Sequence, residues 1–234
     1  MMSFIKKIIL SSFENKQVEI YQSTRNLDFS NSVISQYELN RLFHSTIPGF
    51  KFIQQTHEDS ILELKNIYLS SKCDAVFTRN HNIYVAVRTA DCVPIILTNK
   101  ECTFVAAIHC GWRGFVIGLL EKMILQIKEK NLIAWIGPCI SQDKFEVDRD
   151  VYDKFIHKNK QFTYFIRYKK NKFFIDLVGI AQFILKNQNV VTIAGNDKSD
   201  VWCTYKNDAK FFSYRRGFDK GRMATFAAIA NKKI

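Results

Sequence analysis

The stretch FVAAIHCGWRGFVIGLLEKMILQIKEK, residues 104–130, joins a strand-like run to an amphipathic helix through a turn with two glycines. Alternation predicts a strand at its start, on which Val105, Ala107 and His109 share one face. From 115 to 130, apolar residues recur at helical spacing and form one broad buried face. We therefore expect strand, tight turn and helix in direct succession, with His109 at the turn.

Further strands and helices are expected on both sides of this stretch. Strands are expected at 18–22, 50–54, 75–78, 83–89, 94–98, 132–136, 162–167, 172–175, 190–194, 211–214 and 223–230, and helices at 31–43, 148–157 and 177–186. Strands outnumber helices, and short turns often join neighbouring strands. This pattern favours an α+β sandwich over a regular βαβ repeat.

Composition indicates an ordinary globular chain of 234 residues. Apolar residues make up 47% and charged residues 24%, which excludes disordered and fibrous proteins. The sequence contains no internal repeat, low-complexity tract or linker. We therefore expect a single domain over residues 1–234.

The balance of charge is basic, with 34 Lys and Arg against 22 Asp and Glu and a net charge of +12. The basic residues are mostly scattered lysines, without a dense Arg run or an aromatic RNA-binding motif, so no nucleic-acid partner is expected. No apolar run approaches the roughly 18 residues that a membrane helix needs, so no membrane partner is expected either. The start of the chain has no signal-peptide core, which predicts a cytoplasmic protein with six reduced cysteines.

Three residues with metal-binding side chains lie at the ends of strand-like segments: His57, Cys92 and His109. Two imidazoles and one thiolate leave the fourth position of zinc open, which is the pattern of a catalytic site. The three residues are 35 and 17 positions apart, and no local motif enforces such a site. Each histidine is also compatible with a structural role in the core, and the spacing leaves both interpretations open.

Arginines stand near two glycine-containing turns. The turn at 109–114 leads into the predicted helix, whose exposed N–H groups favour an anion, and Arg113 adds a planar cation there. Near the C-terminal end of the chain lie Arg215, Arg216 and Arg222. The adjacent pair Arg215–Arg216 follows a predicted strand and can hold a phosphate or stack on a base. A strand-to-helix turn and a basic surface hairpin explain the same residues without a ligand.

Six motifs occur in an order that resembles a known family. They are Q-T-H at 55–57, T-A-D-C-V-P at 89–94, H-C-G-W-R-G at 109–114, I-G-P-C-I at 136–140, C-T at 203–204 and F-S-Y-R-R at 212–216. The chain resembles the YfiH-like laccase-domain, or multicopper polyphenol oxidoreductase, family, whose members are described as purine nucleoside phosphorylases. The resemblance spans roughly residues 18–230, and the A-D-C-x-P and H-x-G-W-R-G motifs are highly specific to the family.

The resemblance implies an α/β/β/α sandwich with mixed β-sheets and a zinc ion held by His57, Cys92 and His109. It implies purine nucleosides and phosphate as ligands, with phosphorolysis of adenosine, inosine and methylthioadenosine and deamination of adenosine. It also implies a ligand role for Arg25, in an S-T-R motif. The glycine-rich stretch that usually follows this motif is missing here, and Cys110 replaces a small residue before the G-W-R-G motif.

Three further residues are candidates for the chemistry of such an enzyme. Arg113 and Arg216 are candidates for contacts with phosphate or substrate. Asp91 is a candidate for an acid/base or for a partner that orients a metal ligand. The H-x-E and P-C-x-x-C signature of zinc deaminases is absent, so deamination would use a different kind of site.

The same residues allow other functions. One Cu²⁺ ion fits the same three ligands, as in a polyphenol oxidase, but five histidines are too few for a multicopper cluster. A cysteine hydrolase would use Cys92 as nucleophile and His57 or His109 as base. A non-enzymatic nucleotide-binding protein would use the basic surface, and both a monomer and a homodimer remain open.

Overall fold

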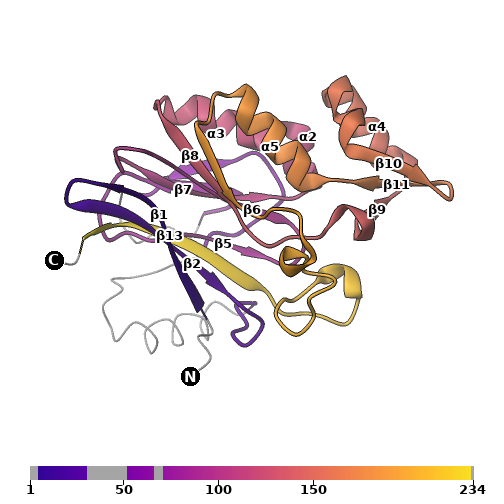
Figure 1. Ribbon diagram of the computed structural model, residues 1–234, viewed down its shortest axis with the longest axis horizontal. Helices are drawn as coiled ribbons and strands as arrows, with labels where there is room; N and C mark the ends of the chain where they lie inside the picture. Colours follow the sequence, from indigo (N-terminus) through magenta and orange to yellow (C-terminus); the bar gives the residue numbers. More distant parts are fainter. Residues whose placement is uncertain (1–4, 31–51, 66–70, 233–234) are drawn as a thin grey trace.

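Two β-sheets lie face to face, and helices cover the outer side of the larger one (Figure 1). The structure, a computed structural model, describes residues 5–30, 52–65 and 71–232. The larger sheet has the order β12-β8-β6-β7-β4-β3, with strands Thr192–Gly195, Leu132–Ile136, Val93–Asn99, Val105–Cys110, Ala75–Thr78 and Ile61–Glu63. Its edge pairs β12–β8 and β3–β4 are parallel and its inner pairs antiparallel, so the sheet is mixed.

The second sheet is antiparallel throughout, with the order β1-β2-β13-β5. Its strands are Ile5–Phe13, Lys16–Ser23, Met223–Asn231 and Val85–Thr89. A third, small sheet has the order β10-β11-β9, with strands Ile166–Lys169, Lys172–Ile175 and Glu146–Val147. It projects from the body of the molecule beside α4, Arg149–Lys158 (Figure 1).

The helices α2, α3 and α5 pack on the outer face of the larger sheet; they are Trp112–Ile117, Leu119–Ile127 and Leu177–Asn187. Strand β7 is buried on both faces because helices cover one and the second sheet covers the other. Ala106 and Ile108 face the helices, whereas Val105 and Ala107 face the second sheet, which confirms the predicted alternation. Short 3₁₀ turns complete the chain at Gln142–Lys144, Lys160–Phe165, Asp200–Trp202 and Tyr214–Arg216.

The α+β class is confirmed, and one helical layer and two sheets of the expected sandwich are described. The helix expected at 31–43 lies outside the described residues. Among the described helices, none has both the length and the apolar character needed to cross a bilayer.

The long helix predicted at 115–130 is two helices. Gly118 breaks it, because its left-handed backbone (φ 80°) ends α2 and starts α3. Its N–H bonds the carbonyl of Phe115, which closes the first helix. The second helix ends before Lys128, which is also left-handed, so the prediction extended the helix too far at its C-terminal end.

Three predicted strands are wrong, and three of the described strands were missed. At 50–54 the described residues make only an isolated bridge between Gln54 and Lys72. The range 162–167 is mostly a 3₁₀ turn, and 211–214 is an irregular loop that leads into another. The missed strands are β1, β3 and β9. Strand β1 pairs with β2 and carries two lysines within its apolar run, whereas β3 and β9 are only three and two residues long. The strands predicted at 75–78, 132–136 and 172–175 match the structure residue for residue, and the other correctly predicted strands differ from it by one or two residues at their ends.

Candidate metal centre and its cavity

The side chains of His57, Cys92 and His109 meet, with one ligand atom of each within 4.8 Å of the others. The imidazole rings of the two histidines lie edge to face, with centroids 4.7 Å apart. His109 is buried in β7, Cys92 is half-buried in the turn before β6, and His57 lies exposed in a loop. The predicted candidates are therefore brought together by three separate segments of the larger sheet and its loops.

Strand register explains why Cys92 lies beside His109. In the antiparallel pair β6–β7, Val93 is opposite Cys110 and Pro94 is opposite His109. The residue before Val93 thus lies across from the start of the glycine turn, next to the end of β7. Cys110 faces the helices instead and packs in their core, so its thiol belongs to the opposite side of the strand.

Asp74, which no sequence motif indicated, links two of the candidate ligands. One of its carboxylate oxygens accepts a hydrogen bond from His109 Nδ1 at 2.7 Å. The other accepts bonds from the backbone amides of Thr56 and Glu58, at 3.1 and 2.8 Å, on both sides of His57. This pairing fixes the tautomer of His109 and turns its Nε2 away from Asp74 and toward Cys92. The only hint of this role in the sequence is the position of Asp74, an acidic residue immediately before an apolar strand.

The titratable side chains of the site shift one another's pKa values. Burial raises the pKa of Asp74, but hydrogen bonds from His109 and from the Glu58 amide outweigh it and lower the pKa to about 2. Burial lowers the pKa of His109, but Cys92 and Asp74 outweigh it and raise the pKa to about 9. Burial lowers the pKa of His57, and the nearby positive charges of His109, Arg113 and Arg222 lower it further. A metal bound here would therefore meet a His57 whose lowered pKa favours the neutral form, whereas it would have to displace a proton from His109.

Gly111 lets the backbone pass close to the three candidate ligands. A Cβ atom at this position would lie 3.0 Å from Cys92 Sγ and 3.1 Å from His57 Nδ1. Its φ of −74° is available to any residue, so the requirement for glycine is one of space. Gly111 caps α2 at its N-terminus and therefore holds the start of that helix against the site.

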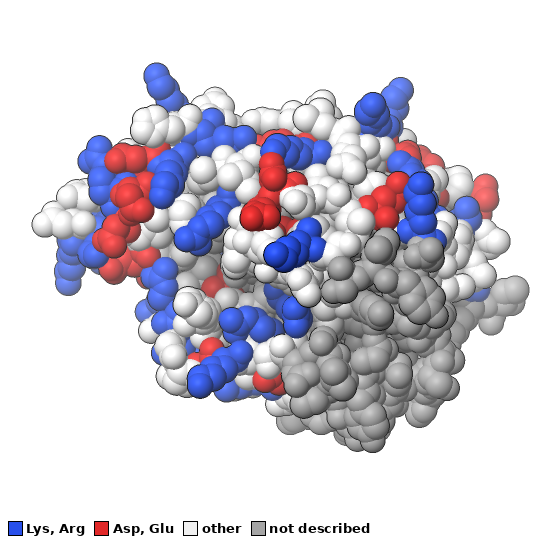
Figure 2. Space-filling model, turned by 180° about the vertical axis from the view of Figure 1, so that it is seen from behind, with Lys and Arg blue, Asp and Glu red and all other residues white. Residues whose placement is uncertain are grey.

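The candidate ligands line a cavity of about 630 Å³. Five basic side chains also line it: Arg88, Arg113, Arg215, Lys220 and Arg222. Aromatic residues contribute Trp112, Phe145 and Tyr214, and Asp91 is the acidic residue among those lining the cavity. Seen from behind, the surface shows Lys and Arg side chains around a hollow (Figure 2). The cavity therefore suits a ligand with both an aromatic ring and negative charge.

Asp91 is held inside a hydrogen-bond network. Its carboxylate accepts bonds from Thr204 Oγ1 at 2.5 Å, Ser213 Oγ at 3.0 Å and the Arg215 amide at 2.7 Å. Its backbone is left-handed, with φ 92°, which is a strained conformation for a residue other than glycine. The side chain thus ties the turn before Cys92 to the C-terminal loop.

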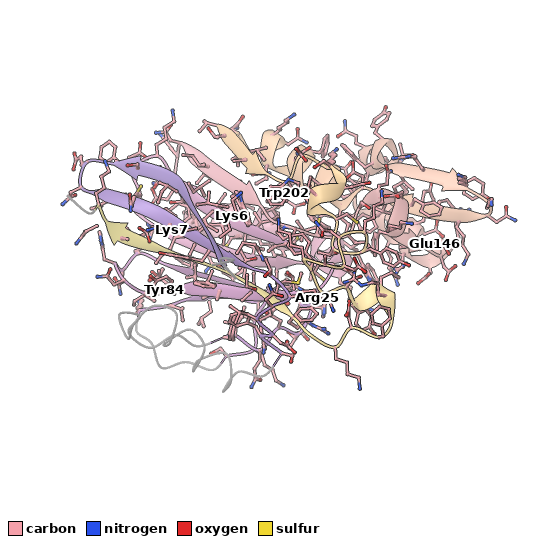
Figure 3. All side chains as sticks on the ribbon, turned by 60° about the horizontal axis from the view of Figure 1, so that its bottom comes forward. Lys6, Lys7, Arg25, Tyr84, Glu146 and Trp202 are labelled. Carbon is pink, nitrogen blue, oxygen red and sulfur yellow. The ribbon has the colours of Figure 1, made fainter. Side chains whose placement is uncertain are left out.

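The three predicted substrate arginines lie in different environments. Arg113 lines the cavity, and its guanidinium lies 4.3 Å from the centroid of the Trp112 ring. Arg216 does not line it, because its guanidinium bonds Asp219 and the backbone carbonyls of the surrounding loop. Arg25 also lies away from the cavity lining, where β2 ends beside the C-terminal segment, and it pairs with Asp219 (Figure 3).

Comparison with known proteins places these features in a family. The family model described as multi-copper polyphenol oxidoreductase laccase matches residues 25–230. The purine nucleoside phosphorylase YfiH of Escherichia coli K12 is 35% identical over 178 residues, which cover 75% of this chain and 72% of that protein. The purine nucleoside phosphorylase RC0672 of Rickettsia conorii is 29% identical over 219 residues, or 91% of this chain and 88% of that protein.

The fold is shared with solved structures as well. Protein NMB0706 of Neisseria meningitidis superposes with a TM-score of 0.83 at 26% identity, over 98% of this chain and all of that chain. The resemblance seen in the sequence motifs is thereby confirmed. The chain belongs to the YfiH-like, multi-copper polyphenol oxidoreductase laccase family, and relatives in it carry the name purine nucleoside phosphorylase.

Proposed function

We propose that this protein is a zinc-dependent purine nucleoside phosphorylase that acts on adenosine, inosine and methylthioadenosine and also deaminates adenosine. The observation that carries the proposal is the meeting of two imidazoles and one thiol within 4.8 Å, at a cavity lined by Arg113. The names of the relatives support the phosphorylase activity.

The donor set fits zinc. His57, Cys92 and His109 supply two nitrogens and one sulfur, and three protein ligands leave a position open for substrate or water. Asp74 orients His109 in the manner of a carboxylate–histidine pair at zinc sites. A zinc ion held there would act as a Lewis acid that polarises a substrate oxygen or lowers the pKa of a water molecule.

Residues of the chain would position the two substrates. In phosphorolysis, the bond between ribose C1′ and purine N9 breaks, a phosphate oxygen bonds to C1′, and the departing base takes up a proton. Arg113 would hold the phosphate, because its guanidinium is oriented by the Trp112 ring and forms no ion pair with a described carboxylate. Asp91 would position the loop that carries Arg215, since its two carboxylate oxygens already accept three hydrogen bonds.

Metal analysis of the purified protein, paired with adenosine turnover, tests the proposal. We expect one zinc ion per chain and release of adenine that requires phosphate. Release of inosine without phosphate would report the deaminase activity. Zinc without turnover of any purine nucleoside would overturn the proposed substrates.

Two alternatives use the same residues and give different results. A copper enzyme would contain copper and oxidise phenols, as the family description suggests, although the described residues form a single three-ligand cluster. A cysteine hydrolase would form a covalent adduct at Cys92, beside His109, and would work without metal. Adduct trapping by mass spectrometry, with and without a chelator, separates these outcomes from the zinc enzyme.

A further inference from the structure

The cavity holds more positive charge than one phosphate ion needs. Of its five basic residues, none forms an ion pair with an Asp or Glu among the described residues. Arg25 and Arg216 in the adjoining loop are different, because both pair with Asp219. Asp91 does not neutralise the cluster either, since its carboxylate is occupied by hydroxyl and backbone donors.

Aromatic rings hold these guanidinium groups in place without neutralising them. The Cζ atoms of the four arginines lie 4.3–5.9 Å from a ring centroid, in the pairs Arg88–Phe52, Arg113–Trp112, Arg215–Phe145 and Arg222–Tyr214. A backbone carbonyl also holds one of these guanidinium groups in place, because Arg215 Nη1 donates a hydrogen bond to the Glu146 carbonyl at 2.8 Å. Stacked, unpaired arginines are preorganised for planar recognition of phosphate.

Part of the cluster lies beyond the metal end of the cavity. Tyr214, Arg215, Lys220 and Arg222 also line a neighbouring hollow of about 510 Å³, which the metal ligands do not line. Arg215, Lys220 and Arg222 therefore form an outer group of cations, which the C-terminal loop carries. Asp219 also lines this hollow, but it is paired with Arg25 and Arg216. Arg113, one residue from the Gly111–Trp112 start of α2, belongs to the metal end instead.

The basic side chains of the cavity repel one another. Burial lowers the pKa of Arg88, and the neighbouring charge of Arg222 lowers it further. Like charges held together in a half-enclosed cavity raise the free energy of the empty site, and a bound polyanion relieves that repulsion.

We propose that the cavity binds purine nucleoside 5′-phosphates more tightly than purine nucleosides, with the phosphate chain held by Arg215, Lys220 and Arg222. The nucleoside part of this ligand rests on the proposed function. Arg113 can bind the phosphate that attacks C1′. A neutral nucleoside then offers the outer cations no negative charge to bind. A phosphate on the 5′ carbon, at the opposite end of the ribose from the base, supplies the charge that they lack.

Calorimetric titration of the zinc-loaded protein with adenosine, AMP, ADP, orthophosphate and pyrophosphate tests this. We expect AMP and ADP to bind at least about tenfold more tightly than adenosine, with the preference weakening as salt is added. Lys220→Gln and Arg215→Gln should each remove most of the preference, and Lys220→Gln should change adenosine affinity less than about twofold. Lys169→Gln and Arg149→Gln, which remove the same charges at exposed sites in β10 and α4, should retain the preference.

Equal affinities for AMP and adenosine would overturn the proposal. So would pyrophosphate binding as tightly as ADP, since the site would then recognise phosphate alone. These measurements need no turnover, so they separate the two proposals. AMP preference without phosphorolysis would reject the phosphorylase activity only, and phosphorolysis without AMP preference would reject the nucleotide preference only.

Discussion

Asp74 bonds His109 Nδ1 with one carboxylate oxygen and the backbone on both sides of His57 with the other. One fully buried side chain therefore sets the orientation of two candidate metal ligands that are 52 residues apart in the sequence. His109 also donates its backbone N–H to the Asp74 carbonyl at 2.8 Å, so strand pairing and side-chain pairing act together. A metal bound at this site would depend on a residue that does not touch it.

Asp74→Asn should weaken zinc binding about 10- to 100-fold, the usual effect of removing a partner that orients a metal ligand. The amide cannot accept bonds on both sides, so either His109 or the His57 loop loses its anchor. Competition with a chelating dye measures the zinc affinity of the variant and of the wild type. An unchanged affinity in a folded variant would show that Asp74 does not position the ligands.

Gly111→Ala should reduce zinc affinity by about tenfold or more, because the added methyl group would crowd Cys92 Sγ and His57 Nδ1. Gly114→Ala is the matched control, since its Cβ would meet Cys110 Sγ at an ordinary 3.5 Å. The control should bind zinc normally and keep or slightly raise the free energy of unfolding, because alanine favours the helix. Equal zinc affinities in the two variants would contradict the steric argument.

Asp91→Asn separates a positioning role from acid/base catalysis. Loss of a charged acceptor for three donors should lower the free energy of unfolding by about 1–3 kcal/mol, as measured by denaturant titration. A positioning residue predicts a lower kcat/KM with an unchanged pH profile, because the C-terminal loop is displaced. Disappearance of one limb of the pH–rate profile would instead identify Asp91 as the acid or base.

Arg113→Gln and Arg216→Gln should have opposite consequences. The Arg113 side chain is exposed at the cavity, so its loss should change stability by less than about 0.5 kcal/mol and raise the KM for phosphate about tenfold. Arg216 is nearly buried and bonds Asp219, so its loss should cost about 2 kcal/mol or more of unfolding free energy. Thermal unfolding and steady-state kinetics on both variants measure the contrast, and a stable Arg216→Gln protein with a raised KM would reverse the assignment.

Zinc affinity should rise steeply with pH. In the metal-free protein the pKa of His109 is raised from 6.5 to about 9, so zinc must displace a proton from it below about pH 9. Each displaced proton makes the apparent affinity about tenfold higher per pH unit. The raised pKa also stabilises the metal-free fold below pH 6.5, and that contribution is lost as the pH rises through about 9. Zinc titrations and unfolding curves from pH 6.5 to about 9 check both slopes, and a flat zinc affinity would refute this protonation state.

Local pattern predicted most of the strands, and it failed where backbone conformation or loop packing decides. Alternation predicted the faces of β7 because buried strands must match the cores on both sides. Periodicity could not show that Gly118 adopts a left-handed conformation, since the apolar face continues across it. The loop before Tyr214 resembles a strand in composition, but Asp91 and Asp219 hold its backbone in another shape.

The sequence by itself determined the sandwich class, the family and the types of metal-binding side chain, because these depend on periodicity and on motifs that are short and local. Only the tertiary structure decided which arginines face the cavity and which residue orients His109. Arg215 and Arg216 are adjacent in the sequence, yet one lines the cavity and the other supports a loop. Those roles depend on contacts across large separations, such as the 122 residues between Asp91 and Ser213, which no local pattern encodes.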